Sequence, residues 1–244
     1  MTEPEDFLRS SFERAKREHE ATAFHEGGHV AGAWAWGVPI RGPVTIAPNL
    51  RCWGSAVIGK RFSQETVLEV LSGAALGKAI PPKPRQDLEA HILVLYAGRL
   101  AEARAVRDGE ATADPLPTDP LEREWLPRRL LMERLALGDA REAAGLPRWP
   151  PSDDDQAAEI LRTLSAGRVE EANAYGAWLW ERAVRMVEGD ELFWTVARAV
   201  AGTLLGVETL SATATRRVVR AALRPEVTPE FSNYIGEPKE AKHG

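Results

Sequence analysis

The sequence predicts a mainly α-helical protein that carries one small β-sheet. Apolar residues recur at steps of three and four over long stretches of the 244-residue chain, which is the spacing of helices with one buried face. Two short runs at 43–46 and 54–58, joined by turn-forming residues, predict two neighbouring strands. Hydrophobic residues make up 44% of the chain, which is ample for a buried core.

Composition divides the chain into three parts. Residues 1–20 are charged and amphipathic and predict an N-terminal helical segment that can continue into the next helix. Residues 21–224 form the main domain, interrupted at about 108–151 by a proline-rich insertion in which long helices are disfavoured. This insertion is interpreted either as a lid-like excursion or as a plain surface loop. Residues 225–244 are polar and predict a flexible tail.

A helix is predicted over residues 21–36, and it contains the pattern H-E-x-x-H. His25 and His29 stand four residues apart, so both imidazoles lie on one face of the helix, where they can bind a single metal ion. Glu26 projects beside the metal position and can accept a proton from a water there, as in the helices of zinc-dependent peptidases. The alternative is a chance match, since five histidines are scattered through the chain.

The two predicted strands follow this helix and place a small sheet beside it. If Val44, Thr45 and Ile46 form an open strand edge, an extended peptide can bind there as an additional strand. Further helices are predicted at 88–106, 170–187 and 191–205 and from Ser211 to about 223, with Gly206 as a C-cap. His91 lies on the first of these helices and is interpreted as a core residue rather than a ligand.

Another helix is predicted to begin after Ser152, a good N-cap residue that is followed by three aspartates. Asp155, three positions on, nearly completes a capping box. Asp153 shares a helix face with Ala157 and Leu161 and therefore points toward the core. A structural explanation is equally open, because the helix dipole favours acidic residues at any helix start.

Three segments, in this order, resemble the zinc peptidase domain of FtsH-type proteases, which are attached to membrane-bound AAA ATPases. They are residues 22–29 (TAFHEGGH), residues 44–48 (VTIAP) with Gly54 beyond, and residues 97–102 (AGRLAE). Gly27 stands where the family prefers alanine. The resemblance implies an FtsH-peptidase-like helical domain carrying the H-E-x-x-H helix, with Zn2+ as its cofactor.

The resemblance also implies that the third zinc ligand is an aspartate at a helix start, in a pattern like Asn/Ser-Asp-Leu-x-x-Ala. Residues 152–157 (SDDDQA) match this pattern except that Asp154 stands where the family has leucine. Asp153 is therefore the first candidate for the third ligand and Asp154 the second. Asp119 is a further alternative, although a proline follows it.

Together these features predict a zinc-dependent metalloendopeptidase in which Glu26 is the general base. The alternatives are a catalytically inactive peptidase-like protein with an interaction or regulatory role, and a helical protein with an accidental motif. The chain has neither the phosphate-binding loop of an ATPase nor the transmembrane helices of the full-length family. We therefore expect peptides or unfolded segments as substrates, unless a separate partner unfolds them, and either a monomer or a small homo-oligomer.

Charge and hydropathy exclude other classes of function. A formal net charge of −5 argues against nucleic acid as the main partner, because binding phosphates requires concentrated Lys and Arg. The chain contains no run of eighteen apolar residues, so membrane insertion is not predicted. The acidic N-terminus does not resemble a secretory signal. With Cys52 as the single cysteine, the sequence predicts a soluble, cytoplasmic protein.

Overall fold

A computed structural model describes residues 4–47, 54–59, 68, 70, 72–73, 80–112 and 152–224. Its helices are α1 (Pro4–Ala35), α3 (Pro82–Arg107), α5 (Asp153–Leu164), α6 (Val169–Gly189), α7 (Glu191–Val207) and α8 (Ala212–Ala222). Its strands are β1 (Ile40–Thr45), β2 (Ser55–Ile58) and β3 (Thr209–Leu210). The predicted mainly helical protein with a small sheet is thereby confirmed. Most of the insertion, Asp119 and the predicted tail lie outside the described residues.

The sheet is antiparallel with the strand order β2-β1-β3, so β1 is its central strand. Val44 pairs with Ala56 and Leu210, and Thr45 pairs with Ser55 and Thr209. The amide of Ile46 donates to the carbonyl of Glu208 at 2.8 Å. The prediction that Val44, Thr45 and Ile46 offer an open edge is therefore wrong, because β3 occupies that edge.

Glycines on α1 allow two other helices to approach its backbone closely. A Cβ on Gly27 would lie 2.6 Å from the carbonyl oxygen of Ala197 in α7. On the α3 side, a Cβ on Gly28 would lie 2.5 Å from the carbonyl oxygen of Ala97, and one on Gly32 would lie 2.9 Å from the Ala97 side chain. Each glycine costs about 1 kcal/mol of helix propensity, which the close packing of α1 against α3 and α7 offsets.

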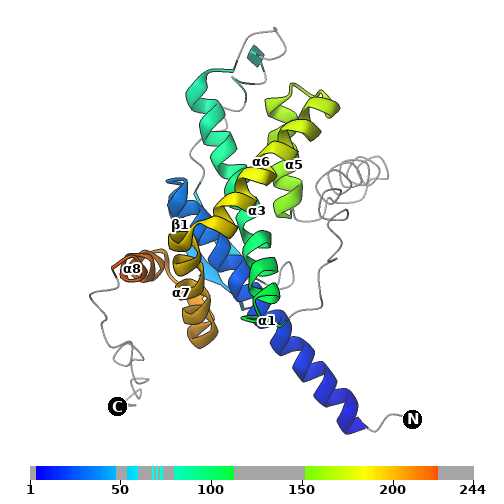
Figure 1. Ribbon diagram of the computed structural model, residues 1–244, viewed down its shortest axis with the longest axis vertical. Coiled ribbons are helices and arrows are strands. Elements are labelled where there is room, and N and C mark those ends of the chain that lie inside the picture. Colours follow the sequence, from blue (N-terminus) through cyan, green and yellow to red (C-terminus); the bar gives the residue numbers. More distant parts are fainter. Residues whose placement is uncertain are drawn as a thin grey trace, which may run out of the picture.

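Helix α3 packs against α1 and also against α5 and α6 (Figure 1). It contributes buried residues to two hydrophobic cores. The sheet-side core lies among α1, α7, α8, the sheet and one face of α3, and includes Phe24, Val30, Val44, Val94, Phe193, Trp194, Val200 and Leu204. The α6-side core lies among the other face of α3, α5 and α6, and includes Ile92, Leu93, Tyr96, Leu161, Leu179 and Ala183. His91 is buried in α3 between hydrophobic neighbours, as predicted.

The ends of the helices follow their capping residues. Ser152 and Asp155 form a complete capping box at the start of α5, and Ser211 caps α8. The predicted C-cap Gly206 is wrong, because α7 continues to Val207 and Glu208 takes the left-handed conformation with φ 55°. Within the described ranges, no helix has the length and apolar character needed to cross a bilayer.

Candidate metal centre

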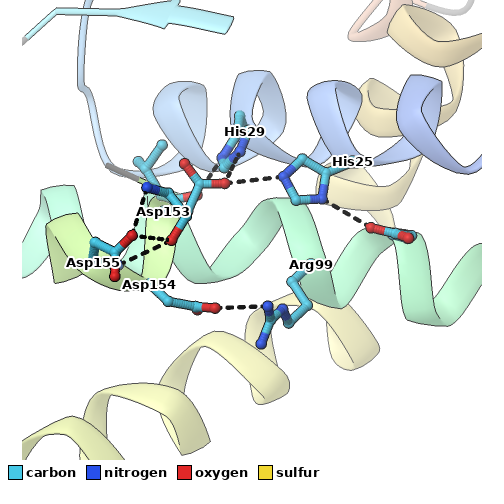
Figure 2. Close-up of polar contacts among 9 residues, drawn as sticks. His25, His29, Arg99, Asp153, Asp154 and Asp155 are labelled. Carbon is cyan, nitrogen blue, oxygen red and sulfur yellow. Dashed lines mark hydrogen bonds and ion pairs between the residues drawn. The ribbon is translucent and has the colours of Figure 1, made fainter. Parts of the chain in front are cut away.

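Two helices that are far apart in sequence bring three potential metal ligands together. His25 and His29 project from the same face of α1, with their ring centroids 4.7 Å apart. Asp153 is the first residue of α5, and its Oδ2 lies 3.0 Å from Nε2 of each histidine (Figure 2). One ligand atom from each of these residues lies within 4.8 Å of the others, so the group can hold a metal ion. The structure thus places the first candidate for the third ligand beside both histidines.

The other ring nitrogen of each histidine is held by α3. The His29 Nδ1–H donates to the carbonyl oxygen of Val94 at 2.9 Å, and because a carbonyl only accepts, Nε2 is left to face the site. The His25 Nδ1–H donates to Oε2 of Glu102, also at 2.9 Å. Histidine ligands of metals are oriented in this way, by a carboxylate or a backbone carbonyl on the second nitrogen.

Gly98 forms the floor of the site on α3. A Cβ at this position would lie 2.6 Å from Nε2 of His29 and 3.0 Å from Nε2 of His25. Any side chain here would therefore occupy the space beside the ligand nitrogens. Val94, Gly98 and Glu102 recur every four residues and form one stripe of α3 that faces the imidazoles.

The three consecutive aspartates at the start of α5 have three different partners (Figure 2). Asp153 contacts the imidazoles, and Asp155 accepts from the Ser152 amide at 2.9 Å within the capping box. Asp154 accepts a hydrogen bond from Nη2 of Arg99 at 2.7 Å and so forms an ion pair with α3 instead of joining the ligand group. The second candidate for the third ligand is therefore engaged elsewhere.

Glu26 is buried beside the two imidazoles, with 4% of its surface exposed. Its Oε2 has no hydrogen-bond partner among the described residues. Its Oε1 faces Gly54, the residue before β2, where a Cβ would lie 2.8 Å away. Burial raises the pKa of the Glu26 carboxyl, and the charges of His29 and His25 oppose this rise only in part. A buried carboxylate oxygen without a partner is costly for stability.

Contacts among the candidate ligands shift their pKa values in the direction opposite to the effect of burial. Burial acts to lower the pKa of His25, but hydrogen bonds to Asp153 and Glu102 raise it to about 10. The pKa of His29 is raised as well, by Asp153 against the effect of burial. For the Asp153 carboxyl, burial acts to raise the pKa, and the two imidazoles hold it well below its usual range. The Asp153 carboxylate supplies negative charge for a cation, and a metal ion that binds here would displace the Nε2 protons of the two imidazoles.

The donor set and its spacing fit a divalent metal ion. Two imidazole nitrogens and one carboxylate oxygen are a set of protein ligands found at catalytic zinc sites. Ligand atoms about 2.0 Å from zinc at a tetrahedral angle lie roughly 3.3 Å apart. The N···O separations of 3.0 Å therefore have to open only slightly. Three protein ligands leave a fourth coordination position for water or substrate.

A scan against protein-family models finds no match for the chain, and a search of curated proteins finds no significant match. The likeness to FtsH-type peptidases consequently stays a prediction from the quoted motifs. What the protein does has to be inferred from the geometry of its own side chains.

Proposed function

We propose that this protein is a zinc-dependent metalloendopeptidase. The observation that carries the proposal is the position of Glu26, a buried carboxylate next to the group formed by His25, His29 and Asp153. A metal site with only a structural role gains nothing from an additional buried carboxyl, one oxygen of which has no hydrogen-bond partner in the described part of the chain. A hydrolytic site requires a base at this place.

His25, His29 and Asp153 would hold the zinc ion, and Glu102 and the Val94 carbonyl would keep the imidazoles oriented toward it. When bound, zinc supplies a water of lowered pKa and polarises the scissile carbonyl. Glu26 accepts the proton of the attacking water and delivers it to the leaving amine. The pKa of this carboxyl is raised toward neutral pH, where one group can both accept and return a proton.

The edge of the sheet at β2 is the place where an extended peptide would bind. Within the described part of the chain β2 pairs only with β1, whereas β1 is paired on both sides. The residue before β2, Gly54, lies close to both Glu26 and Thr22 of α1. A peptide that adds to the outer edge of β2 would therefore run past the general base. Recognition through the backbone suits unfolded segments and flexible peptides as substrates.

The proposal is tested by measuring bound zinc and the cleavage of an unfolded protein substrate. Glu26→Gln should retain zinc and lower the cleavage rate by about 10²–10⁴-fold, because the amide cannot accept the proton. Asp153→Ala should lose both zinc and cleavage. Glu159→Gln, an exposed position on α5, is the matched control and should behave as wild type. Equal cleavage by wild type and Glu26→Gln at equal zinc content would exclude this mechanism.

A further inference from the structure

The third ligand reaches the metal centre on a helix that belongs to a different core from the first two. Helix α1 packs against α3 and α7, whereas α5 packs against α3 and α6. Asp153 therefore depends on α3 for its position relative to His25 and His29. A displacement of α5 along α3 would remove the carboxylate from both imidazoles while leaving α1 in place.

One ion pair joins the start of α5 to α3 at the level of the metal centre. Asp154 follows the ligand Asp153, and Arg99 follows the floor residue Gly98. Figure 2 shows this ion pair, in which Nη2 of Arg99 and Oδ2 of Asp154 are 2.7 Å apart. The Arg99 side chain is 30% exposed and the Asp154 side chain 17%. The capping box shapes the first turn of α5 internally but does not determine where this turn lies on α3. The Arg99–Asp154 ion pair joins this turn directly to α3.

We propose that Arg99 and Asp154 are a positioning pair that sets the metal affinity by holding Asp153 against the two imidazoles. The inference rests on the metal site of the proposed function, but it does not depend on catalysis. The pair acts in two ways. It fixes the first turn of α5, and it neutralises Asp154, whose charge would otherwise repel the adjacent Asp153 carboxylate and compete for the cation.

The test is a double-mutant cycle on the full chain, with zinc affinity measured by competition against a chromophoric chelator. Arg99→Gln should weaken zinc binding by about 10-fold, within the range known for residues that support metal ligands. Asp154→Asn should weaken it less, because it removes the contact without leaving an unpaired charge beside Asp153. The double variant should bind zinc about as well as Asp154→Asn, because the two substitutions remove the same contact. Arg99→Lys retains the charge and should recover most of the affinity. The visible spectrum of bound Co2+ should show altered coordination in the single variants.

An ion pair farther along α3 supplies the matched control. Arg107 of α3 contacts Glu188 of α6 at 2.6 Å, about two helical turns beyond Arg99. Arg107→Gln also removes an ion pair between α3 and α6, but it leaves the start of α5 untouched. Its zinc affinity should stay within twofold of wild type. An equal loss in Arg107→Gln would mean that general loosening weakens the site, and the inference would be overturned.

Other outcomes also decide the question. Zinc affinities within twofold of wild type in both Arg99→Gln and Asp154→Asn would overturn the inference, as would effects that simply add in the double variant. If Arg99→Gln does not fold, the nearly isosteric Asp154→Asn together with Arg99→Lys still gives the answer. If wild type binds zinc but cleaves nothing, the peptidase proposal fails while the affinity series stands. If wild type binds no metal, both proposals fail.

Discussion

The two cores on either side of α3 contribute to the metal centre in different ways. In the sheet-side core, α1 meets α3 and α7 backbone to backbone on glycines such as Gly28, and this helix carries both histidines and Glu26. In the α6-side core, α5 is a 12-residue helix that packs through side chains and carries only Asp153. Two ligands are thus fixed by helical spacing and tight packing, and the third is fixed by side-chain contacts with α3.

Helix α3 connects the two cores through four residues that lie within about two helical turns. Val94, Gly98 and Glu102 face the imidazoles, and Arg99 faces the start of α5. The position of α3 relative to α1 and α5 therefore determines the geometry of the candidate metal centre. Substitutions on the two sides should differ in what they disturb, and this difference can be measured.

The largest effect is expected at Gly98, where the two cores meet. Gly98→Ala places a Cβ 2.6 Å from Nε2 of His29, so the imidazole must turn away and zinc affinity should fall by about 100-fold or more. The matched control is Gly202→Ala on α7, where a Cβ meets nothing within 4 Å. It should bind zinc like wild type and gain up to about 1 kcal/mol of stability from helix propensity. Zinc binding by Gly98→Ala within tenfold of wild type would refute this steric account.

A smaller but still large effect is expected where α1 meets α3. Gly28→Ala puts a Cβ 2.5 Å from the backbone carbonyl of Ala97, and backbone atoms cannot move without shifting the whole helix. The free energy of unfolding should fall by about 2–3 kcal/mol, measured by urea denaturation of the metal-free protein. An unchanged unfolding midpoint would show that the sheet-side core is less rigid than its glycine contacts indicate.

The electrostatic contact between the two cores should appear as a pH dependence of the metal-free protein. The pKa of His25 is about 10 in the folded state against 6.5 for an ordinary histidine, and Asp153 and Glu102 cause the rise. A raised folded pKa stabilises the protein fully below about pH 6.5, and this stability is lost as the pH rises toward 10. Urea midpoints of chelator-treated protein should therefore decrease over this window. The decrease should be smaller in Asp153→Asn, and an equal decrease would contradict a contribution from this contact.

Local spacing explains which parts of the fold and site were predictable from sequence. The H-E-x-x-H pattern places His25 and His29 on one helix face wherever the helix packs, and Ser152 with Asp155 marks the start of α5 by short-range hydrogen bonds. This helix start and the resemblance together favour Asp153 as the third ligand. The two predicted strands also lie close to the observed β1 and β2.

Long-range contacts explain what was not predictable. Strand β3 has two residues, too few to show a period. The sequence therefore gives no sign of the strand that pairs with β1 on this side. The roles of Arg99 and Glu102 depend on the placement of α3 between two cores, which no local pattern encodes. The four-residue step from Gly98 to Glu102 places both residues on one face of α3, and this spacing is a sequence signal that links Glu102 to the imidazoles.

The smallest effect is expected at Gly176, the counterpart of Gly28 in the α6-side core. A Cβ here would lie 2.9 Å from Cδ1 of Leu161, the far end of a flexible side chain, and 3.6 Å from the Tyr96 hydroxyl. The gain in helix propensity should nearly offset the repacking, so Gly176→Ala should change the free energy of unfolding by less than about 1 kcal/mol. Leu161 lies eight residues after Asp153 on α5, so a shift of this leucine tests what positions the ligand. If the Arg99–Asp154 pair holds the first turn, zinc affinity should stay within twofold. A tenfold loss at unchanged stability would instead assign the position of Asp153 to apolar packing.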